Sequence, residues 1–309
     1  MGGGAGRGAG VMARLVCFGL GYCAEHFIAE YGAKFGHIVG TVRSAERAAI
    51  LNAYQSEKVR ALVFDGVRVT PELERAIVAA DQALVSVPPD ASGDPVLAAG
   101  GAALAAAGNL RALVYLSTVG VYGDRGGGWV DEQTPVAPAS ERSRWRAAAE
   151  QAWAQFGAQR GIPVAILRLA GIYGPGQNAL VALARGKARR IAKAGQVFNR
   201  IHVGDIAQAI DAAFARRASG VFNIADDEPS PAADPIMFAA QLMGREPPPE
   251  IPFAEAAPSM SEMGLSFWQE CRRVRNDKLK RELGVTLRYP TYRAGLRALF
   301  KEINGGSGL

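Results

Sequence analysis

The feature that most constrains this chain is the alternation of short apolar runs with longer helical stretches. The apolar runs lie at residues 15–18, 38–42, 61–64, 83–87, 112–116, 164–167 and 221–224. The helical stretches between them are residues 24–31, 45–54, 71–79, 95–107, 143–156 and 205–216. Because parallel strands need a long crossover connection, which is usually a helix, this alternation predicts an α/β chain with a doubly wound parallel sheet.

The character of the sequence changes after residue 225. Pro-rich segments then flank a further helical stretch at residues 235–243. We therefore expect a smaller C-terminal region that covers the carboxyl edge of the sheet and binds the substrate. The expected divisions are a loose tail at 1–12, a dinucleotide-binding sheet domain at 13–225 and the C-terminal region at 226–309.

Composition excludes several classes of protein. Hydrophobic residues make up 49% of the chain and charged residues 21%, which is a globular balance, and the basic clusters behind the net charge of +6 contain few aromatic residues. We therefore expect a small-molecule partner and no nucleic acid. The longest nearly uncharged apolar stretch, residues 95–108, is shorter than the roughly 20 residues that a membrane-spanning helix needs, so no membrane partner is expected.

The cysteines indicate the compartment. Cys17, Cys23 and Cys271 have no metal-ligand spacing and form no even disulfide set. This predicts no metal site and a reducing, cytoplasmic location.

The first apolar run leads directly into a glycine-rich turn and then a helical stretch. The turn reads Gly19-Leu20-Gly21-Tyr22-Cys23-Ala24. In such a Gly-x-Gly-x-x-Ala motif the first glycine permits a tight turn, the second lets backbone amides approach a pyrophosphate, and the alanine lets the helix pack closely. The phosphates then lie at the positive end of the helix. The motif predicts a Rossmann-type site in which these residues bind a dinucleotide.

The end of the second apolar run indicates which dinucleotide is bound. An acidic residue there would bind the ribose hydroxyls of NAD, but Arg43 and Ser44 follow the run instead. A guanidinium can pair with a 2′-phosphate through two hydrogen bonds, and a serine adds a hydroxyl. We therefore expect NADP(H) to be preferred, with NAD(H) still possible. The alternative is that Arg43 is a solvated residue at the start of a helix.

Three further residues are expected at the same cofactor. Asp65 follows the third apolar run and is placed either to accept a hydrogen bond from the adenine amino group or to cap the following turn. Val87 and Pro88 follow the fourth run. They are expected to line the cofactor cleft.

Four later segments together resemble the extended short-chain dehydrogenase/reductase family of NAD(P)-dependent epimerases and dehydratases. They read LSTVGVYG at 116–123, LRLAGIYGPG at 167–176, RIHVGDIA at 200–207 and NDKLKRELG at 276–284. The resemblance extends over nearly the whole chain from residue 13. In detail the chain is most similar to the YeeZ-like bacterial branch.

The resemblance implies a catalytic Ser/Thr, a Tyr that carries a proton, and a Lys that holds the ribose. Thr118 matches the hydroxyl position, but Arg142 stands where the Tyr is expected and Arg146 where the Lys is expected. A guanidinium, with a pKa above about 12, cannot exchange a proton at neutral pH. Arg146 can still hold ribose or phosphate oxygens, so we expect it at the cofactor.

Three other residues in the matched segments, Tyr122, Tyr173 and His202, are candidates for the missing proton carrier. The resemblance favours a structural role for Tyr122, as a ring packed beneath the cleft. Tyr173 follows the sixth apolar run, where the resemblance places a loop beside the nicotinamide, and His202 has an ordinary pKa near 6.5. For His202 the alternative is a hydrogen-bonded structural residue. Tyr173 and His202, with Thr118, form the predicted catalytic set.

Two functions are consistent with these residues. The first is an NAD(P)-dependent oxidoreductase or epimerase-like enzyme that acts on a small hydroxyl or carbonyl compound, such as a sugar or nucleotide-sugar derivative. The second is an NADP(H)-binding sensor or regulatory protein without redox turnover, which the replacement of the Tyr-x-x-x-Lys pair by Arg142 and Arg146 favours. The resemblance also implies a possible homodimer.

Overall fold

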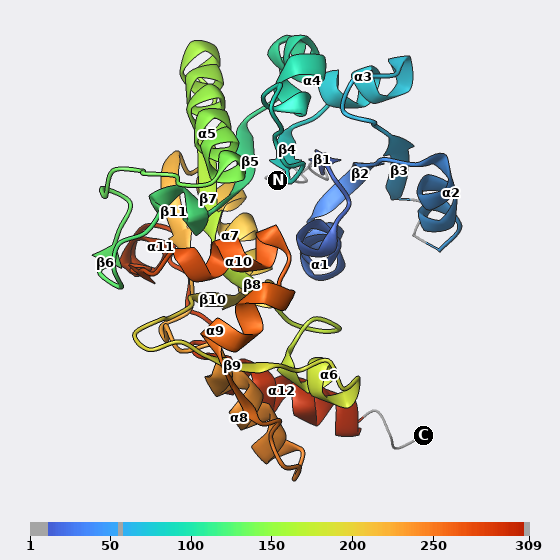
Figure 1. Cartoon of the computed structure of the whole chain (residues 1–309). Coiled ribbons are helices and arrows are strands. Elements are labelled where there is room, and N and C mark those ends of the chain that lie inside the picture. The colour runs from blue at the N-terminus through green and yellow to red at the C-terminus, as the bar shows by residue number, and fades with distance from the viewer. Residues whose placement is uncertain (1–11, 55–57, 306–309) are drawn as a thin grey trace, which may run out of the picture.

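In the computed structural model, which describes residues 12–54 and 58–305, a seven-stranded parallel sheet forms the centre of the fold (Figure 1). Its strands are β1 (Ala13–Phe18), β2 (Phe35–Val42), β3 (Val59–Val63), β4 (Gln82–Val85), β5 (Ala112–Thr118), β7 (Val164–Leu169) and β11 (Gly220–Ile224). They are arranged in the order β11-β7-β5-β4-β1-β2-β3, and every neighbouring pair is parallel. The predicted doubly wound α/β fold is confirmed. Of the tail expected at residues 1–12, all but Met12 lies outside the described residues.

Helices cover both faces of the sheet. They are α1 (Tyr22–Tyr31), α2 (Ala45–Tyr54), α3 (Pro71–Val78), α4 (Pro95–Ala106), α5 (Glu141–Arg160) and α7 (Val203–Arg216). On one face the core includes Phe27 of α1 and Ile210 of α7. On the other face it includes Leu73 of α3, Leu104 of α4 and Trp153 of α5. Because both faces are covered, the strands read as continuous apolar runs, which is why the sequence revealed them.

Helix α5 is longer than the stretch predicted at residues 143–156. It begins after Ser140, whose hydroxyl accepts a hydrogen bond from the Ser143 amide at 3.2 Å. It ends at Gly161, which has the left-handed conformation (φ 63°) that favours glycine. The two caps therefore determine the length of this helix.

The remaining elements are short and mostly C-terminal. The structure contains the 3₁₀ turns η1 (Gly32–Lys34), η2 (Val119–Tyr122) and η3 (Ala257–Ser259), and the short strands β6 (Trp129–Val130), β8 (Gly171–Tyr173), β9 (Arg190–Ala192), β10 (Arg200–His202), β12 (Glu250–Pro252) and β13 (Arg273–Val274). The other helices are α6 (Ala179–Ala184), α8 (Ala233–Leu242), α9 (Phe253–Ala256), α10 (Glu262–Gln269), α11 (Asp277–Glu282) and α12 (Tyr292–Gly305).

Segments from the middle of the chain pair with segments from its C-terminal part. Strand β12 pairs with β9, and β13 pairs with β6, in both cases in parallel. A third, small core joins Leu180 of α6 to Ala239 of α8 and Leu296 of α12. Residues on both sides of position 225 thus build the layer below the sheet in Figure 1.

No helix in residues 12–54 and 58–305 is long and apolar enough to cross a membrane.

Candidate functional site

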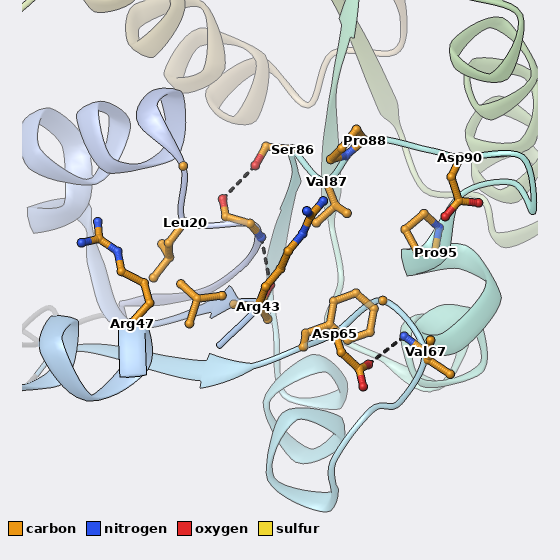
Figure 2. Close-up of a pocket in the computed structure, with 16 residues that line it drawn as sticks. Leu20, Arg43, Arg47, Asp65, Val67, Ser86, Val87, Pro88, Asp90 and Pro95 are labelled. Atoms are coloured by element: carbon orange, nitrogen blue, oxygen red, sulfur yellow. Dashed lines mark hydrogen bonds between the residues drawn. The ribbon is translucent and has the colours of Figure 1, made fainter. Parts of the chain in front are cut away.

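A cavity of about 620 Å³ lies where the first four strands end (Figure 2). The glycine-rich turn follows β1, Arg43 follows β2, Asp65 follows β3 and Val87 follows β4. The strand order reverses between β1 and β4, and such switch points are the usual ligand sites of open parallel sheets. Its lining residues are Gly19, Leu20, Gly21, Thr41, Val42, Arg43, Arg47, Phe64, Asp65, Gly66, Val67, Ser86, Val87, Pro88, Asp90 and Pro95.

Gly19 takes a conformation that other residues rarely adopt. Its φ is +95°, and a Cβ there would lie 2.6 Å from the Ser86 Oγ. The Gly19 amide donates to the Thr41 Oγ1 at 2.9 Å, and the Ser86 hydroxyl donates to the Gly19 carbonyl at 2.8 Å. The neighbouring strands β2 and β4 therefore hold this turn in place.

Gly21 leaves the start of α1 open to a ligand. No heavy atom lies within 4 Å of the position that its Cβ would occupy. It stands at the N-cap of α1 but provides no side-chain acceptor for the first-turn amides. An open helix N-terminus with unsatisfied amides fits a pyrophosphate, so the residues present suit a dinucleotide.

The remaining motif residues, Tyr22, Cys23 and Ala24, hold α1 in place and do not line the cavity. Cys23 and Ala24 are buried, and burial raises the pKa of the Cys23 thiol to about 12. The Tyr22 hydroxyl donates to the Pro175 carbonyl at 2.9 Å, which joins α1 to the loop after β8. These three residues do not line the cavity, whereas Gly19, Leu20 and Gly21 do.

Two guanidinium groups reach the cavity from the end of β2 and the start of α2 (Figure 2). Arg43 was predicted there and Arg47 was not. The Arg47 Nη2 lies 2.8 Å from the Glu25 Oε1 of α1, while both arginine side chains stay exposed. The sequence signal for Arg47 is its closeness to Arg43 in the chain, because Arg43 lies just before α2 and Arg47 lies in the first turn of that helix. Ser44 does not line the cavity; its hydroxyl accepts from the Arg47 amide at 3.2 Å and caps α2.

Asp65 caps the turn after β3. Its Oδ1 accepts from the Arg68 amide at 2.9 Å and from the Val67 amide at 2.8 Å, and these bonds hold the pKa of the carboxyl below its usual value. Of the two roles left open by the sequence, the capping role is present. The residue also lines the cavity, as do Val87 and Pro88.

Thr118 stands at the end of β5, where its Oγ1 accepts from the Gly120 amide at 3.1 Å. Arg142 lies exposed in the first turn of α5, and its side chain makes no polar contact with any residue that the structure describes. Arg146 points inward: its Nη1 donates to the Tyr115 hydroxyl at 3.0 Å and to the Leu116 carbonyl at 2.9 Å. Arg146 does not line the cavity.

Tyr173 and His202 lie together, away from the lining of this cavity. Their rings meet edge to face with centroids 5.2 Å apart, and the His202 Nδ1 accepts from the Gly204 amide at 3.1 Å to cap α7. Burial lowers the pKa of His202 to about 4. Burial, with Asp226 and Asp205 nearby, raises the pKa of Tyr173. At neutral pH the imidazole and the phenol are therefore both uncharged.

Asp226 is a further buried acid in this neighbourhood. It is 2% exposed, and its Oδ1 accepts from the Glu228 amide at 3.2 Å. Burial raises the pKa of this carboxyl to about 8, despite the opposing attraction of Arg200. The side chain is therefore largely protonated at neutral pH. Across the part of the chain that the structure describes, no group of three or more His, Cys, Asp or Glu side chains is arranged to hold a metal ion.

Comparison with known proteins gives a consistent family. The model of the NAD dependent epimerase/dehydratase family matches residues 99–225. A functionally unknown conserved protein from Silicibacter pomeroyi has a solved structure with 42% sequence identity and a TM-score of 0.83, and the match covers 94% of this chain and 99% of that chain. A putative NAD-dependent epimerase/dehydratase from Methylobacillus flagellatus has the same fold, with 23% identity, a TM-score of 0.71, and coverage of 95% and 99%.

A curated relative is the 3-diazoavenalumate denitrifying reductase of a Streptomyces species. It is 30% identical over 202 residues, which are 62% of this chain and 66% of the reductase. The match thus spans slightly less than two thirds of that protein. The family resemblance predicted from the sequence is confirmed: the chain belongs to the NAD dependent epimerase/dehydratase family.

Proposed function

We propose that this chain is an NADP(H)-dependent oxidoreductase that acts on a small hydroxyl or carbonyl compound, such as a sugar or nucleotide-sugar derivative. The observation that carries the proposal is the cavity at the strand switch point, whose lining includes both Gly21, at the open start of α1, and Arg43. When bound, the cofactor would supply or accept a hydride. Gly19, Leu20 and Gly21 would bind its pyrophosphate.

The preference for NADP(H) rests on charge. Arg43 has no polar side-chain partner among the residues in 12–54 and 58–305, and Arg47, in the first turn of α2, pairs with Glu25. A 2′-phosphate would give both guanidinium groups an anionic ligand at the cavity edge. NADH offers no such group there.

The name of the curated relative guides the choice of substrates. That protein is named as a reductase of a diazo compound. Screening should therefore run in the direction of NADPH oxidation, and should include diazo compounds beside carbonyl compounds and sugars.

Titration calorimetry tests the cofactor, and the loss of reduced-nicotinamide absorbance tests the reaction. We expect heat with both reduced cofactors and at least about 10-fold tighter binding of NADPH, which equals about 1.4 kcal/mol. We also expect oxidation of NADPH with at least one substrate class. Absence of heat with either cofactor would overturn the proposal.

A second candidate is an NADP(H)-binding regulatory protein without turnover. It is favoured by Arg146, which uses its guanidinium on Tyr115 and Leu116, and by Arg142, which cannot carry a proton. NADPH binding without oxidation by any substrate class would favour it. So would a double variant, Arg142→Tyr with Arg146→Lys, that binds NADPH and gains no activity.

Three organisational predictions belong to the same proposal. We place the protein in the cytoplasm, because Cys17, Cys23 and Cys271 are free thiols. Residues 13–225 would bind the cofactor, and residues 226–309 would cover the substrate. We also propose a homodimer, which light scattering of the purified chain would test.

A further inference from the structure

Two hydroxyl groups from distant parts of the sequence converge at Gly120. The position that a Cβ would occupy on this glycine lies 3.3 Å from the Thr118 Oγ1 and 3.3 Å from the Ser143 Oγ. The two oxygens are therefore at most twice that distance apart. A side chain at position 120 would press against both hydroxyls. All three residues are half-buried.

The existing hydrogen bonds leave both hydroxyl protons available. The Thr118 Oγ1 accepts from the Gly120 amide at 3.1 Å. The Ser143 Oγ accepts from the Ser140 hydroxyl at 2.9 Å, and Ser140 is the N-cap of α5. Each oxygen has accepted a hydrogen bond and retains a proton to donate. The cap of α5 therefore positions Ser143 as well as starting the helix.

We propose that Ser143 is a catalytic residue that, together with Thr118, binds the substrate oxygen as a pair of hydroxyl donors. This inference rests on the proposed oxidoreductase function and adds a residue to it. Arg142, the neighbour of Ser143 in the chain, occupies the position expected for a proton-carrying phenol and cannot give up a proton. The paired hydroxyls stabilise charge on the substrate oxygen instead.

This arrangement restricts the substrate. During reduction the carbonyl carbon receives a hydride with its electron pair, and the carbonyl π pair moves to the oxygen. The resulting alkoxide accepts hydrogen bonds from Thr118 and Ser143, which keep their own protons, and then takes a proton from water. Because Arg142 cannot supply a proton to this oxygen, carbonyl compounds with electron-withdrawing substituents should react best, since their alkoxides need the least stabilisation.

The test compares Ser143→Ala, Ser143→Thr and wild type, with Ser266→Ala as a control. Ser266 lies on α10 and its hydroxyl donates to the Met263 carbonyl at 2.8 Å. The probes are 4-nitrobenzaldehyde and 4-methoxybenzaldehyde with NADPH, followed by absorbance. A readout independent of turnover is the affinity of 4-nitrobenzoate, a stable carboxylate of similar shape, measured through the fluorescence of bound NADPH. Thermal melting checks that each variant folds.

We expect wild type to reduce the nitro compound faster than the methoxy compound. Ser143→Ala should lower kcat by about 100-fold or more, the usual effect of removing one oxyanion donor, and should weaken 4-nitrobenzoate binding about 10-fold. Ser143→Thr and Ser266→Ala should stay within a few-fold of wild type. Equal kcat and equal 4-nitrobenzoate affinity in Ser143→Ala and wild type would overturn the role of Ser143 alone. If wild type binds NADPH but reduces neither aldehyde and binds no 4-nitrobenzoate, the proposed function falls, and this inference with it.

Discussion

Arg168 of β7 forms a buried ion pair with the carboxylate of Glu150 of α5. Its Nη2 lies 2.7 Å from the Glu150 Oε2, and its Nε lies 3.1 Å from each carboxylate oxygen. Both side chains are under 10% exposed, and the Ser117 hydroxyl of β5 also donates to Glu150. Strands β5 and β7 and helix α5 thus meet at one buried ion pair. Its β5 contact, Ser117, directly precedes Thr118 in the chain.

Removing one member of this pair should destabilise the fold strongly. Glu150→Gln leaves the Arg168 charge buried without a counter-charge, and we expect the free energy of unfolding to fall by about 3–5 kcal/mol in urea titrations. Glu141→Gln, an exposed substitution on the same helix, should change it by less than about 0.5 kcal/mol. The double variant Glu150→Leu with Arg168→Met should lose less unfolding free energy than Glu150→Gln, because it leaves no buried charge unpaired. Equal losses for Glu150→Gln and Glu141→Gln would contradict the structural role of the pair.

Two glycines of the cofactor turn should respond differently to the same methyl group. Gly19→Ala forces a left-handed backbone and a collision with Ser86, so stability should fall by about 1–3 kcal/mol. Gly21→Ala meets open space and a φ of −107°, so stability should stay within about 0.5 kcal/mol. NADPH affinity should nevertheless drop at least about 10-fold for Gly21→Ala, because the methyl projects where a phosphate would lie. Unchanged NADPH affinity in a folded Gly21→Ala protein would count against the phosphate site.

Removing Arg43 should weaken the binding of NADPH but hardly affect the binding of NADH. Because a hydrogen-bonded charge is worth about 1.5–3 kcal/mol, Arg43→Ala should weaken NADPH binding by about 10–100-fold and leave NADH binding within a few-fold. Titration calorimetry with each cofactor in turn measures the two affinities. Arg160→Ala, at the exposed last turn of α5, controls for net charge. A loss of NADPH affinity as large in Arg160→Ala would show that the effect is not local.

Asp226 should make the fold less stable as pH rises toward 8. Its folded pKa, about 8, lies above the unfolded value near 3.9, so the folded state binds the extra proton. The contribution is complete below about pH 4 and is lost as pH rises through about 8. The folded pKa of His202 is shifted the other way, from about 6.5 down to about 4, so this residue changes the stability only below about pH 6.5. Between pH 6.5 and 8, the free energy of unfolding measured in urea should therefore fall by about 1–2 kcal/mol more in wild type than in Asp226→Asn. Parallel stability curves for the two proteins would disprove the shift.

Periodicity identified the long elements of this fold but not the short ones. A strand buried on both faces gives a continuous apolar run, and the stretches 38–42 and 112–116 were visible for that reason. Strands β6 and β13 have two residues each, too few for any periodic signal, and their partners are far apart in the chain. Only the tertiary structure pairs them.

At the candidate site, motifs located residues in the chain but did not show where their side chains point. The motif located Gly19, whose backbone conformation requires glycine, and Gly21, which leaves space at the start of α1. The family resemblance placed Arg146 near the cofactor, but no pattern in the sequence shows that this guanidinium turns inward to Tyr115. Ser143 was not recognised, because it lies on helix α5 while Thr118 ends strand β5, and only the fold brings the two hydroxyls near each other.

The parallel pairs β9–β12 and β6–β13 limit how this protein can be engineered. Each pair takes one partner from before residue 225 and one from after it. A chimera that exchanges only the C-terminal part with a relative would therefore inherit strands whose registers were selected against a different backbone. Grafting a new specificity onto this scaffold requires that both members of each pair be transplanted together.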